Sequence, residues 1–396
     1  MDTALPADPP IGELSAEASA VAALRSALSD VMRIDQVIVP VAPDQVVQFR
    51  GRLAIPSTQA YRLIRDRFRG MGYIAFLRRS NLIDGVQAVK GTLRTGRSRV
   101  WINIALLVIS IATMVLSAAI YQVVADLAAS GLNPDGSTFA IALETIGHTP
   151  ALLIQGLPFA ATLLLILGVH EMGHYVAARV HRADVTLPYF IPFPPLGGLS
   201  LGTLGAFVRL RSPIEDRRSL FDIGVAGPLA GLAVAVPLFI VGVALSKLHV
   251  VSAGPGAGGL GMSPLVTWIV TWLQPDTFRP DIGLELHPIG IAAWFGLLLT
   301  MLNLMPIGSL DGGHVMYALA GRAAWAVTAV SLAGLLVLSA LVEWPGWALW
   351  AAVSLLFGLR HPPPLNDVTP LDPKRRMLAF ASLALFVILF VPIPFA

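Results

Sequence analysis

The chain has 396 residues, of which 55% are hydrophobic and 13% are charged, and its formal net charge is +3. Soluble globular proteins carry about twice that share of charged residues, so the composition excludes a soluble fold and indicates an integral membrane protein. The sequence contains no cysteine, which excludes disulfides and a cysteine nucleophile and leaves histidine and carboxylate as the metal ligands.

We expect residues 1–100 to form a small cytosolic α/β domain. Residues 1–20 are acidic and rich in proline, without the apolar core of a signal peptide or the arginines of a transit peptide. Residues 45–94 alternate like strands on both sides of a helical stretch, which predicts a β-α-β-β unit. This basic unit is either a solvated module beside anionic lipid or a domain that senses substrate or binds a partner.

The rest of the chain, residues 101–396, is expected to be embedded in the membrane. A spanning helix needs about twenty apolar residues, and seven segments approach that length. The fourth runs into a broken segment and the sixth is short, so we predict an α-helical multi-pass protein with about six to seven spans. The segments lie at about 101–124, 152–178, 220–246, 289–305, 323–342, 344–359 and 377–395.

Lysine and arginine are distributed unevenly between the loops that these segments define. Of the 27 cationic residues, only Lys247 and Arg279 lie in the loops on one side, and fourteen lie in residues 1–100. Cytosolic loops concentrate positive charge. We therefore expect the N-terminus in the cytosol and the C-terminus outside.

The second apolar segment carries His170-Glu171-Met172-Gly173-His174, an H-E-x-x-H sequence. Residues four apart share one helical face, so His170 and His174 can aim their imidazoles at one metal ion, with Glu171 beside them as a proton acceptor. Polar groups at membrane depth are costly and therefore usually functional. The alternative is that these are core histidines hydrogen-bonded to neighbouring helices.

Two segments follow that ordinary spanning helices do not explain. Residues 188–210 are apolar but interrupted by prolines and glycines, which predicts a re-entrant segment resembling a β-hairpin. The stretch GVAGPLAG at 224–231 is built from small residues, which predicts close helix packing. Contact with a substrate is the alternative for both segments.

A third metal ligand is available in NLMPIGSLDGGH, residues 303–314. A catalytic zinc site uses three protein ligands and leaves one position open. Asp311 lies beyond the break at Pro306, at the membrane depth expected for the two histidines, and becomes the third candidate. His314 is a rival ligand, for which we favour a structural role such as a hydrogen bond to a backbone carbonyl.

HEMGH within a span, followed by NLMPIGSLDGGH, resembles the site-2 protease family of intramembrane zinc metalloproteases. The resemblance covers roughly residues 150–320. It implies an enzyme that hydrolyses peptide bonds within or next to transmembrane segments, with one zinc ion held by His170, His174 and Asp311 and with Glu171 as general base. Its substrates would be membrane proteins, often already cleaved outside the membrane, and nucleic acid is not an expected partner.

A scissile bond inside a helix is shielded, so the substrate must unwind locally. Strand 204–210 could pair with the unwound chain, and we expect substrate contacts at Gly202, Gly205, Ala206 and Phe207. A buried structural plug is the alternative. Asn303 either hydrogen-bonds the substrate carbonyl or caps the broken helix.

The chain lacks an insert large enough for a PDZ domain between its two motifs. With its N-terminal domain it is more similar to the branch found in cyanobacteria, other bacteria and chloroplasts, which implies a prokaryotic plasma membrane as its location. A metal transporter and a non-catalytic metal-binding scaffold are the alternative functions. The sequence leaves the substrate and the oligomeric state open.

Overall fold

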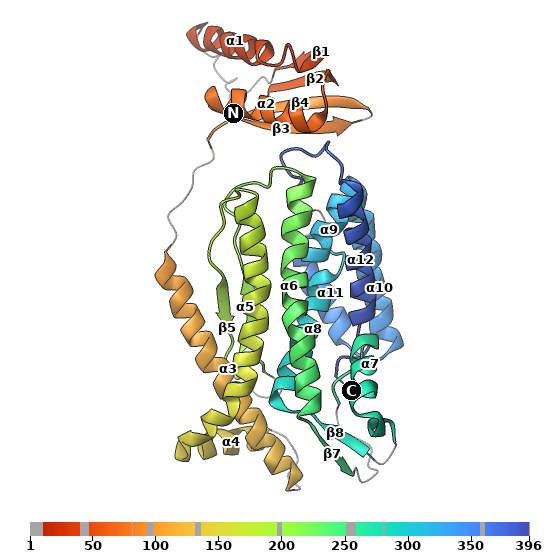
Figure 1. Cartoon of the computed structure of the whole chain (residues 1–396). Coiled ribbons are helices and arrows are strands. Elements are labelled where there is room, and N and C mark those ends of the chain that lie inside the picture. The colour runs from red at the N-terminus through yellow and green to blue at the C-terminus, as the bar shows by residue number, and fades with distance from the viewer. Residues whose placement is uncertain are drawn as a thin grey trace, which may run out of the picture. The chain divides into compact units, whose positions relative to one another are not determined.

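The computed structural model describes residues 11–39, 47–80, 82–92, 99–130, 136–195, 200–250, 259–279, 282–356 and 361–395. The chain divides into two compact units, which are shown in Figure 1. Each unit is assembled from three stretches of the chain. The first unit consists of Met1–Thr95, Pro213–Arg217 and Pro363–Leu371, and the second of Gly96–Ser212, Arg218–Pro362 and Asp372–Ala396.

The first unit is built on an antiparallel sheet with the strand order β1-β2-β4-β3. Alternate residues such as Phe49, Leu77 and Val86 point into a core that α2 also enters, as the period of two in a strand requires. The predicted β-α-β-β unit is present, and the helix and strand that precede it were not anticipated. The elements are α1 (Ile11–Ser26), β1 (Met32–Ile38), β2 (Val47–Leu53), α2 (Ser57–Gly70), β3 (Tyr73–Ser80) and β4 (Ile83–Lys90).

Two short segments from far along the sequence extend this sheet beyond β3. Leu77 forms a parallel bridge with Asn366, which in turn bridges to Asp216. The Leu77 N–H donates to the carbonyl of Leu365 at 2.8 Å, and the Leu365 side chain is buried in the core of the unit. The first unit therefore depends on residues more than a hundred positions away from its own sheet.

The second unit is mainly helical and contains two short antiparallel hairpins, β5 with β6 and β7 with β8. The first hairpin lies within residues 188–210, where a hairpin-like segment was predicted. The helices are α3 (Val100–Ala129), α4 (Gly136–His148), η1 (Pro150–Gly156), α5 (Leu157–Val180), α6 (Arg217–Ala244), α7 (Pro264–Leu273), η2 (Pro275–Phe278), α8 (Pro288–Leu304), α9 (Asp311–Ala320), η3 (Gly321–Ala323), α10 (Ala324–Leu341), α11 (Gly346–Leu356) and α12 (Pro373–Leu389), and the strands are β5 (Tyr189–Pro192), β6 (Thr203–Phe207), β7 (Lys247–Val250) and β8 (Ile282–Glu285).

Four helical segments in the described residues are long and apolar enough to cross a membrane, so the predicted count of six to seven spans is not confirmed. Helix α8 has 17 residues, as many as the predicted span 289–305. Helix α11 has 11 residues and is shorter than the predicted span 344–359, whose last residues 357–359 lie outside the described part. At 1.5 Å per residue the 17 residues of α8 extend about 25 Å, less than the thickness of the hydrocarbon core. The four segments are Val100–Leu127, Pro150–Val180, Arg217–Ala244 and Asp311–Leu341.

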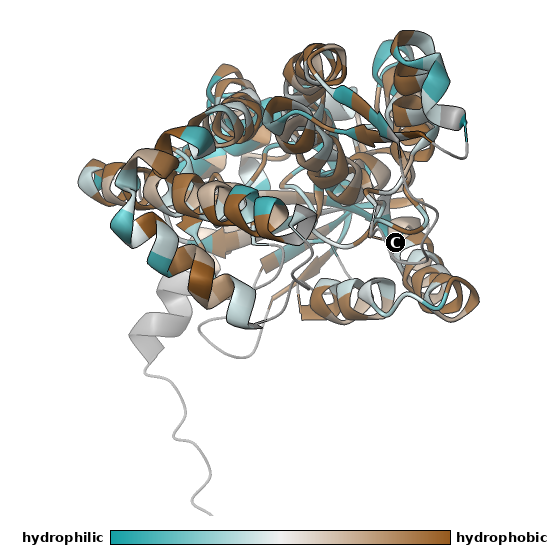
Figure 2. Ribbon diagram, turned by 90° about the horizontal axis from the view of Figure 1, so that it is seen from below, coloured by the Kyte–Doolittle hydropathy of each residue, from teal (hydrophilic) through white to brown (hydrophobic). Residues whose placement is uncertain are grey.

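Large apolar side chains face outward over this unit, as expected of a protein surrounded by lipid. Hydrophobic residues dominate the helices in Figure 2, including those at the periphery. Trp268 of the short helix α7 and Leu341 of α10 are 64% and 75% exposed, and similar residues are exposed on α3, α5, α11 and α12. With the composition, this surface identifies an integral membrane protein.

Helix α5 packs closely against its neighbours because glycines stand at the contacts. A Cβ on Gly156 would lie 2.3 Å from the carbonyl oxygen of Val115 in α3, and one on Gly296 of α8 would lie 2.8 Å from Ile166. Gly173 of α5 faces Ala226 of α6. A Cβ on Gly173 would lie 2.6 Å from the carbonyl oxygen of Ala226. The central helix is thereby fixed on three sides, which positions the polar residues that it carries.

Candidate metal centre

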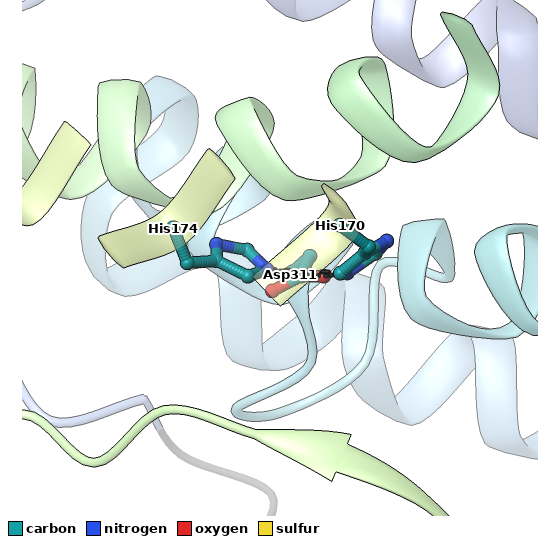
Figure 3. Close-up of side chains that lie close together, drawn as sticks. All are labelled: His170, His174 and Asp311. Atoms are coloured by element: carbon teal, nitrogen blue, oxygen red, sulfur yellow. Dashed lines mark hydrogen bonds and ion pairs between the residues drawn. The ribbon is translucent and has the colours of Figure 1, made fainter. Parts of the chain in front are cut away.

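Two histidines project from one face of α5, one helical turn apart. His170 and His174 are 4% and 6% exposed, and their ring centroids lie 5.0 Å apart. The spacing of four residues produces this arrangement because it returns the side chains to the same helical face. Figure 3 shows both rings directed at a third side chain, Asp311.

Asp311 reaches the histidines from a tight turn between two helices. Helix α8 ends at Leu304, Gly308 adopts a φ of +48°, and α9 begins at Asp311. A Cβ on Gly312 would lie 2.0 Å from the Leu304 carbonyl oxygen, and one on Gly313 would lie 2.2 Å from that of Gly308. Only glycine permits this approach, so the turn fixes the position of the carboxylate.

The facing atoms form a nearly equilateral triangle. Nε2 of His170 lies 3.2 Å from Nε2 of His174, and Oδ2 of Asp311 lies 3.3 Å from each nitrogen. Zinc binds such atoms at about 2.0–2.2 Å, and tetrahedral angles then separate the ligand atoms by about 3.3–3.6 Å. The three residues therefore fit one zinc ion, and three is the number of protein ligands that a catalytic zinc site uses.

A backbone carbonyl fixes the orientation of one histidine. Nδ1 of His174 lies 2.7 Å from the carbonyl oxygen of Ile223 in α6. Because a carbonyl oxygen only accepts, Nδ1 must carry the proton, and in a neutral ring this leaves the lone pair of Nε2 directed at Asp311. Partners of this kind hold ligating histidines in the required tautomer.

The small residues of α6 leave room for the imidazoles. A Cβ on Gly227 would lie 2.1 Å from Nε2 of His174, and one on Gly231 would lie 3.1 Å from Nδ1 of His170. The stretch GVAGPLAG thus packs directly against the metal-binding face of α5. Close packing, one of the two explanations considered for this stretch, accounts for these contacts.

Glu171 is 5% exposed and lies on the side of α5 that meets the β5–β6 hairpin. The backbone N–H of Val208, the residue that follows β6, lies near its carboxylate. A buried carboxylate next to two metal-facing histidines can take up and release a proton. The proximity of Val208 places the end of β6 beside the same group.

Asn303 and His314, the two undecided polar residues of the second motif, occupy different surroundings. The side-chain Nδ2 of Asn303 lies 3.4 Å from Nε2 of His170, next to the metal-facing atoms. His314 lies outside the cluster, with Nδ1 3.0 Å from the carbonyl oxygen of Leu310 and its ring packed against His361. This is the type of backbone contact that we favoured for His314.

The four hairpin residues expected to contact substrate differ in their exposure. Gly202 has a φ of +75° and accepts a hydrogen bond from the Thr113 hydroxyl of α3 at 2.6 Å. Gly205, with a φ of +104°, has open space where a Cβ would be. Ala206 pairs with Phe190 of β5, whereas Phe207 is 46% exposed. Gly202 therefore anchors the hairpin, and among the described strands β6 pairs with β5 alone, so its other edge has no strand partner there.

An ionic cluster near the metal-facing residues was not predicted from the sequence. The Asp222 carboxylate, next to Ile223, lies 2.8 Å from Nε2 of His181 at the end of α5. It also accepts two hydrogen bonds, at 2.8 and 2.6 Å, from Arg375 at the start of α12. No spacing rule joins residues 41 and 153 positions apart, so the sequence alone could not reveal the cluster. We call these three residues the Asp222 cluster.

Comparisons with known proteins indicate the family of the chain. Residues 158–341 match the model of Peptidase family M50. The chain is 32% identical over 283 residues to "Probable zinc metalloprotease EGY1, chloroplastic" of Oryza sativa subsp. japonica, covering 67% of this chain and 46% of the relative. It is 33% identical over 248 residues to "Probable zinc metalloprotease EGY2, chloroplastic" of Arabidopsis thaliana, covering 62% and 43%. The chain thus spans less than half the length of these relatives, and no solved structure matches it significantly.

Proposed function

Because this chain belongs to peptidase family M50 through residues 158–341, we propose that it is an intramembrane zinc metalloprotease that cleaves membrane proteins within or next to their transmembrane segments. The observation that carries the proposal is the triangle formed by the two histidine Nε2 atoms and Oδ2 of Asp311, whose sides measure 3.2–3.3 Å. Glu171 directly follows the first of these ligands in the sequence. His170, His174 and Asp311 hold one zinc ion per chain, and Glu171 is the general base.

The chain's own residues carry the proton transfers. When bound, zinc supplies Lewis acidity, which makes water a stronger acid and polarises a peptide carbonyl. Glu171 accepts the proton that the attacking water loses as the bond between its oxygen and the carbonyl carbon forms. The same carboxyl group then gives this proton to the leaving amine as the C–N bond breaks. Burial of Glu171 keeps bulk water from taking the proton.

The substrate is a transmembrane segment that opens locally and pairs with β6. Gly205, Ala206 and Phe207 offer a strand edge to the opened chain, and the Val208 N–H at the end of that edge lies near Glu171. The amide of Asn303, 3.4 Å from His170, is near enough to the cluster to hydrogen-bond the substrate carbonyl. An earlier cut outside the membrane would shorten the substrate before it enters.

The location that fits the sequence is a prokaryotic plasma membrane, with the N-terminus and the metal centre on the cytosolic side. The distribution of lysine and arginine supports this orientation, because only Lys247 and Arg279 lie in the opposite loops. The named relatives are chloroplastic proteins of plants. A protease accessibility assay on sealed membrane vesicles tests the orientation: residues 11–92 should be cut only in inverted vesicles.

The direct test is Glu171→Gln, assayed in detergent against a peptide that contains one transmembrane segment. The variant should retain zinc and lose cleavage by at least about a hundredfold, because a general base contributes on the order of 10²–10⁴-fold. Glu144→Gln, at an exposed residue of α4, is the matched control and should cleave normally. Unchanged cleavage by Glu171→Gln would exclude the proposed base.

The same pair of variants separates the alternatives. A transporter or scaffold would keep its metal-dependent behaviour in Glu171→Gln, since the carboxylate is not one of the three ligands. Among the described residues, one cluster of three or more histidine and acidic side chains is compact enough to hold a metal. A transport path needs polar groups along its length, so this single cluster favours catalysis.

A further inference from the structure

The two faces of the sheet in the first unit differ in what covers them. Helix α2 packs on one face through Ile64 and Phe68, and the Tyr61 hydroxyl donates to the carbonyl of Ala75. On the opposite face, the strand register aligns Arg50 of β2 and Arg78 of β3 on either side of Gly85 in β4. Two arginines therefore flank a position that has no side chain.

The missing side chain at Gly85 leaves a hollow of about 190 Å³ on this face. A Cβ on Gly85 would point at the side-chain amide nitrogen of Gln48, 3.3 Å away, so hydrogen-bond donors line the hollow beside the arginines. Ser80 adds a hydroxyl at the rim. The lining residues are Gln48, Arg50, Arg78, Ser80, Ile83 and Gly85, and none of them is acidic.

The arginines are held in different ways. Arg50 is exposed and forms no ion pair with a described residue. Arg78 donates through Nη1 to the carbonyl oxygens of Pro364 and Leu365 and lies 5.2 Å from the ring centroid of Phe76. These contacts orient the guanidinium, so an anion would bind it at little further loss of side-chain entropy.

We propose that this hollow is a binding site for a phosphate group, either on a lipid head group or on a soluble ligand. A phosphate presents several oxygens to donors that arrive from opposite sides, and guanidinium groups match that geometry through paired hydrogen bonds. Gln48 and Ser80 supply further donors. The hollow has room for a phosphate and its first substituent, whereas a lone chloride would leave most of it empty.

Calorimetric titration of the full chain in a non-ionic detergent tests the site with two probes. Inorganic pyrophosphate represents a soluble ligand, and short-chain phosphatidylglycerol below its micelle concentration represents a lipid head group. Saturable binding of pyrophosphate identifies a soluble ligand, and binding of the lipid alone identifies a head group. Both outcomes support the site, whereas absence of saturable binding by either probe overturns it.

Three variants test whether the two probes bind in this hollow. Arg50→Gln should weaken the affinity at least about tenfold, because it removes a charge-assisted hydrogen bond to the phosphate. Gly85→Thr should weaken it similarly by filling the hollow with a residue that strands accept. The matched control is Arg62→Gln, an exposed arginine of α2 on the covered face, which should bind as the wild type does. Equal loss in Arg50→Gln and Arg62→Gln would mean general charge attraction and would overturn the proposal.

Discussion

Asp311 is the residue on which the metal centre depends most directly. Among the three candidate ligands, Asp311 is the one with a negatively charged side chain. Asp311→Asn preserves the size of the side chain but removes the charge and the stronger ligand. We expect the affinity for zinc to fall by at least about a hundredfold, since even outer partners of ligands contribute 10- to 100-fold. Metal analysis after dialysis against a chelator measures the loss.

The control for that experiment is Asp276→Asn, because Asp276 is an exposed acidic residue of η2 that is remote from the cluster in sequence. It should retain about one zinc ion per chain. Retention of zinc by Asp311→Asn after the same dialysis would contradict the proposed ligand set.

Gly227 is expected to be as sensitive as a ligand, although it has no side chain. A Cβ at this position would lie 2.1 Å from Nε2 of His174, the atom that faces the metal. Gly227→Ala should therefore displace the imidazole and abolish both zinc binding and cleavage. Gly168→Ala is the control, because a Cβ on Gly168 of α5 meets nothing within 4 Å. That variant should keep its zinc and be equally or slightly more stable, by up to about 1 kcal/mol.

At the scale of elements, the Asp222 cluster joins the ends of α5, α6 and α12 next to the carbonyl that orients His174. Arg375→Gln removes the bidentate partner of Asp222. We expect the free energy of unfolding to fall by about 1–2 kcal/mol and the zinc affinity to fall up to about tenfold through Ile223. The neighbouring Arg376→Gln, at an exposed residue, is the control. Equal zinc affinity in both variants would show that the cluster does not position His174.

The β5–β6 hairpin depends on α3 for its position. The side-chain amide of Asn103 donates at 2.9 Å to the carbonyls of Leu187 and Pro188, just before β5. If β6 binds substrate, Asn103→Ala should raise the KM for a transmembrane peptide while leaving zinc content unchanged. Ser110→Ala is the control on the same helix, because the buried Ser110 hydroxyl has no hydrogen-bond partner among the described residues and its loss costs little. A changed kcat with an unchanged KM would assign the hairpin another role.

The sequence predicted how elements are arranged where the periodicity of a helix or the spacing between residues determines the geometry. The structure brings together His170, His174 and Asp311, because i and i+4 share a helical face and the glycines of the second motif permit a tight turn. It contains the hairpin where proline and glycine interrupt an apolar segment. The Ile223 carbonyl could not be identified, because every residue carries one. The count of six to seven spans is not confirmed, because α8 and α11, with 17 and 11 residues, are shorter than the about twenty residues that a spanning helix needs.

At the scale of the whole molecule, composition identified a membrane protein, but the sequence did not indicate how the first unit is assembled. Its sheet is completed by Pro213–Arg217 and Pro363–Leu371, which immediately precede α6 and α12 in the chain. These pairings cross more than a hundred residues, and local patterns carry no information about them. Ion pairs of Arg65 with Glu215 and of Arg217 with Asp367 add to the pairing of backbones.

Leu365 tests whether the first unit needs its distant segments. Its side chain is 5% exposed and packs in the same core as Phe49 and Leu77. Leu365→Ala should destabilise this unit by about 2–5 kcal/mol, which limited proteolysis would detect as faster cleavage within residues 11–92. Pro363→Ala, at an exposed position of the same segment, should be cut at the wild-type rate. Because Leu365 is not part of the metal centre, zinc content should stay unchanged. If cleavage is no faster in Leu365→Ala, the sheet of residues 32–90 is stable without the segment that precedes α12.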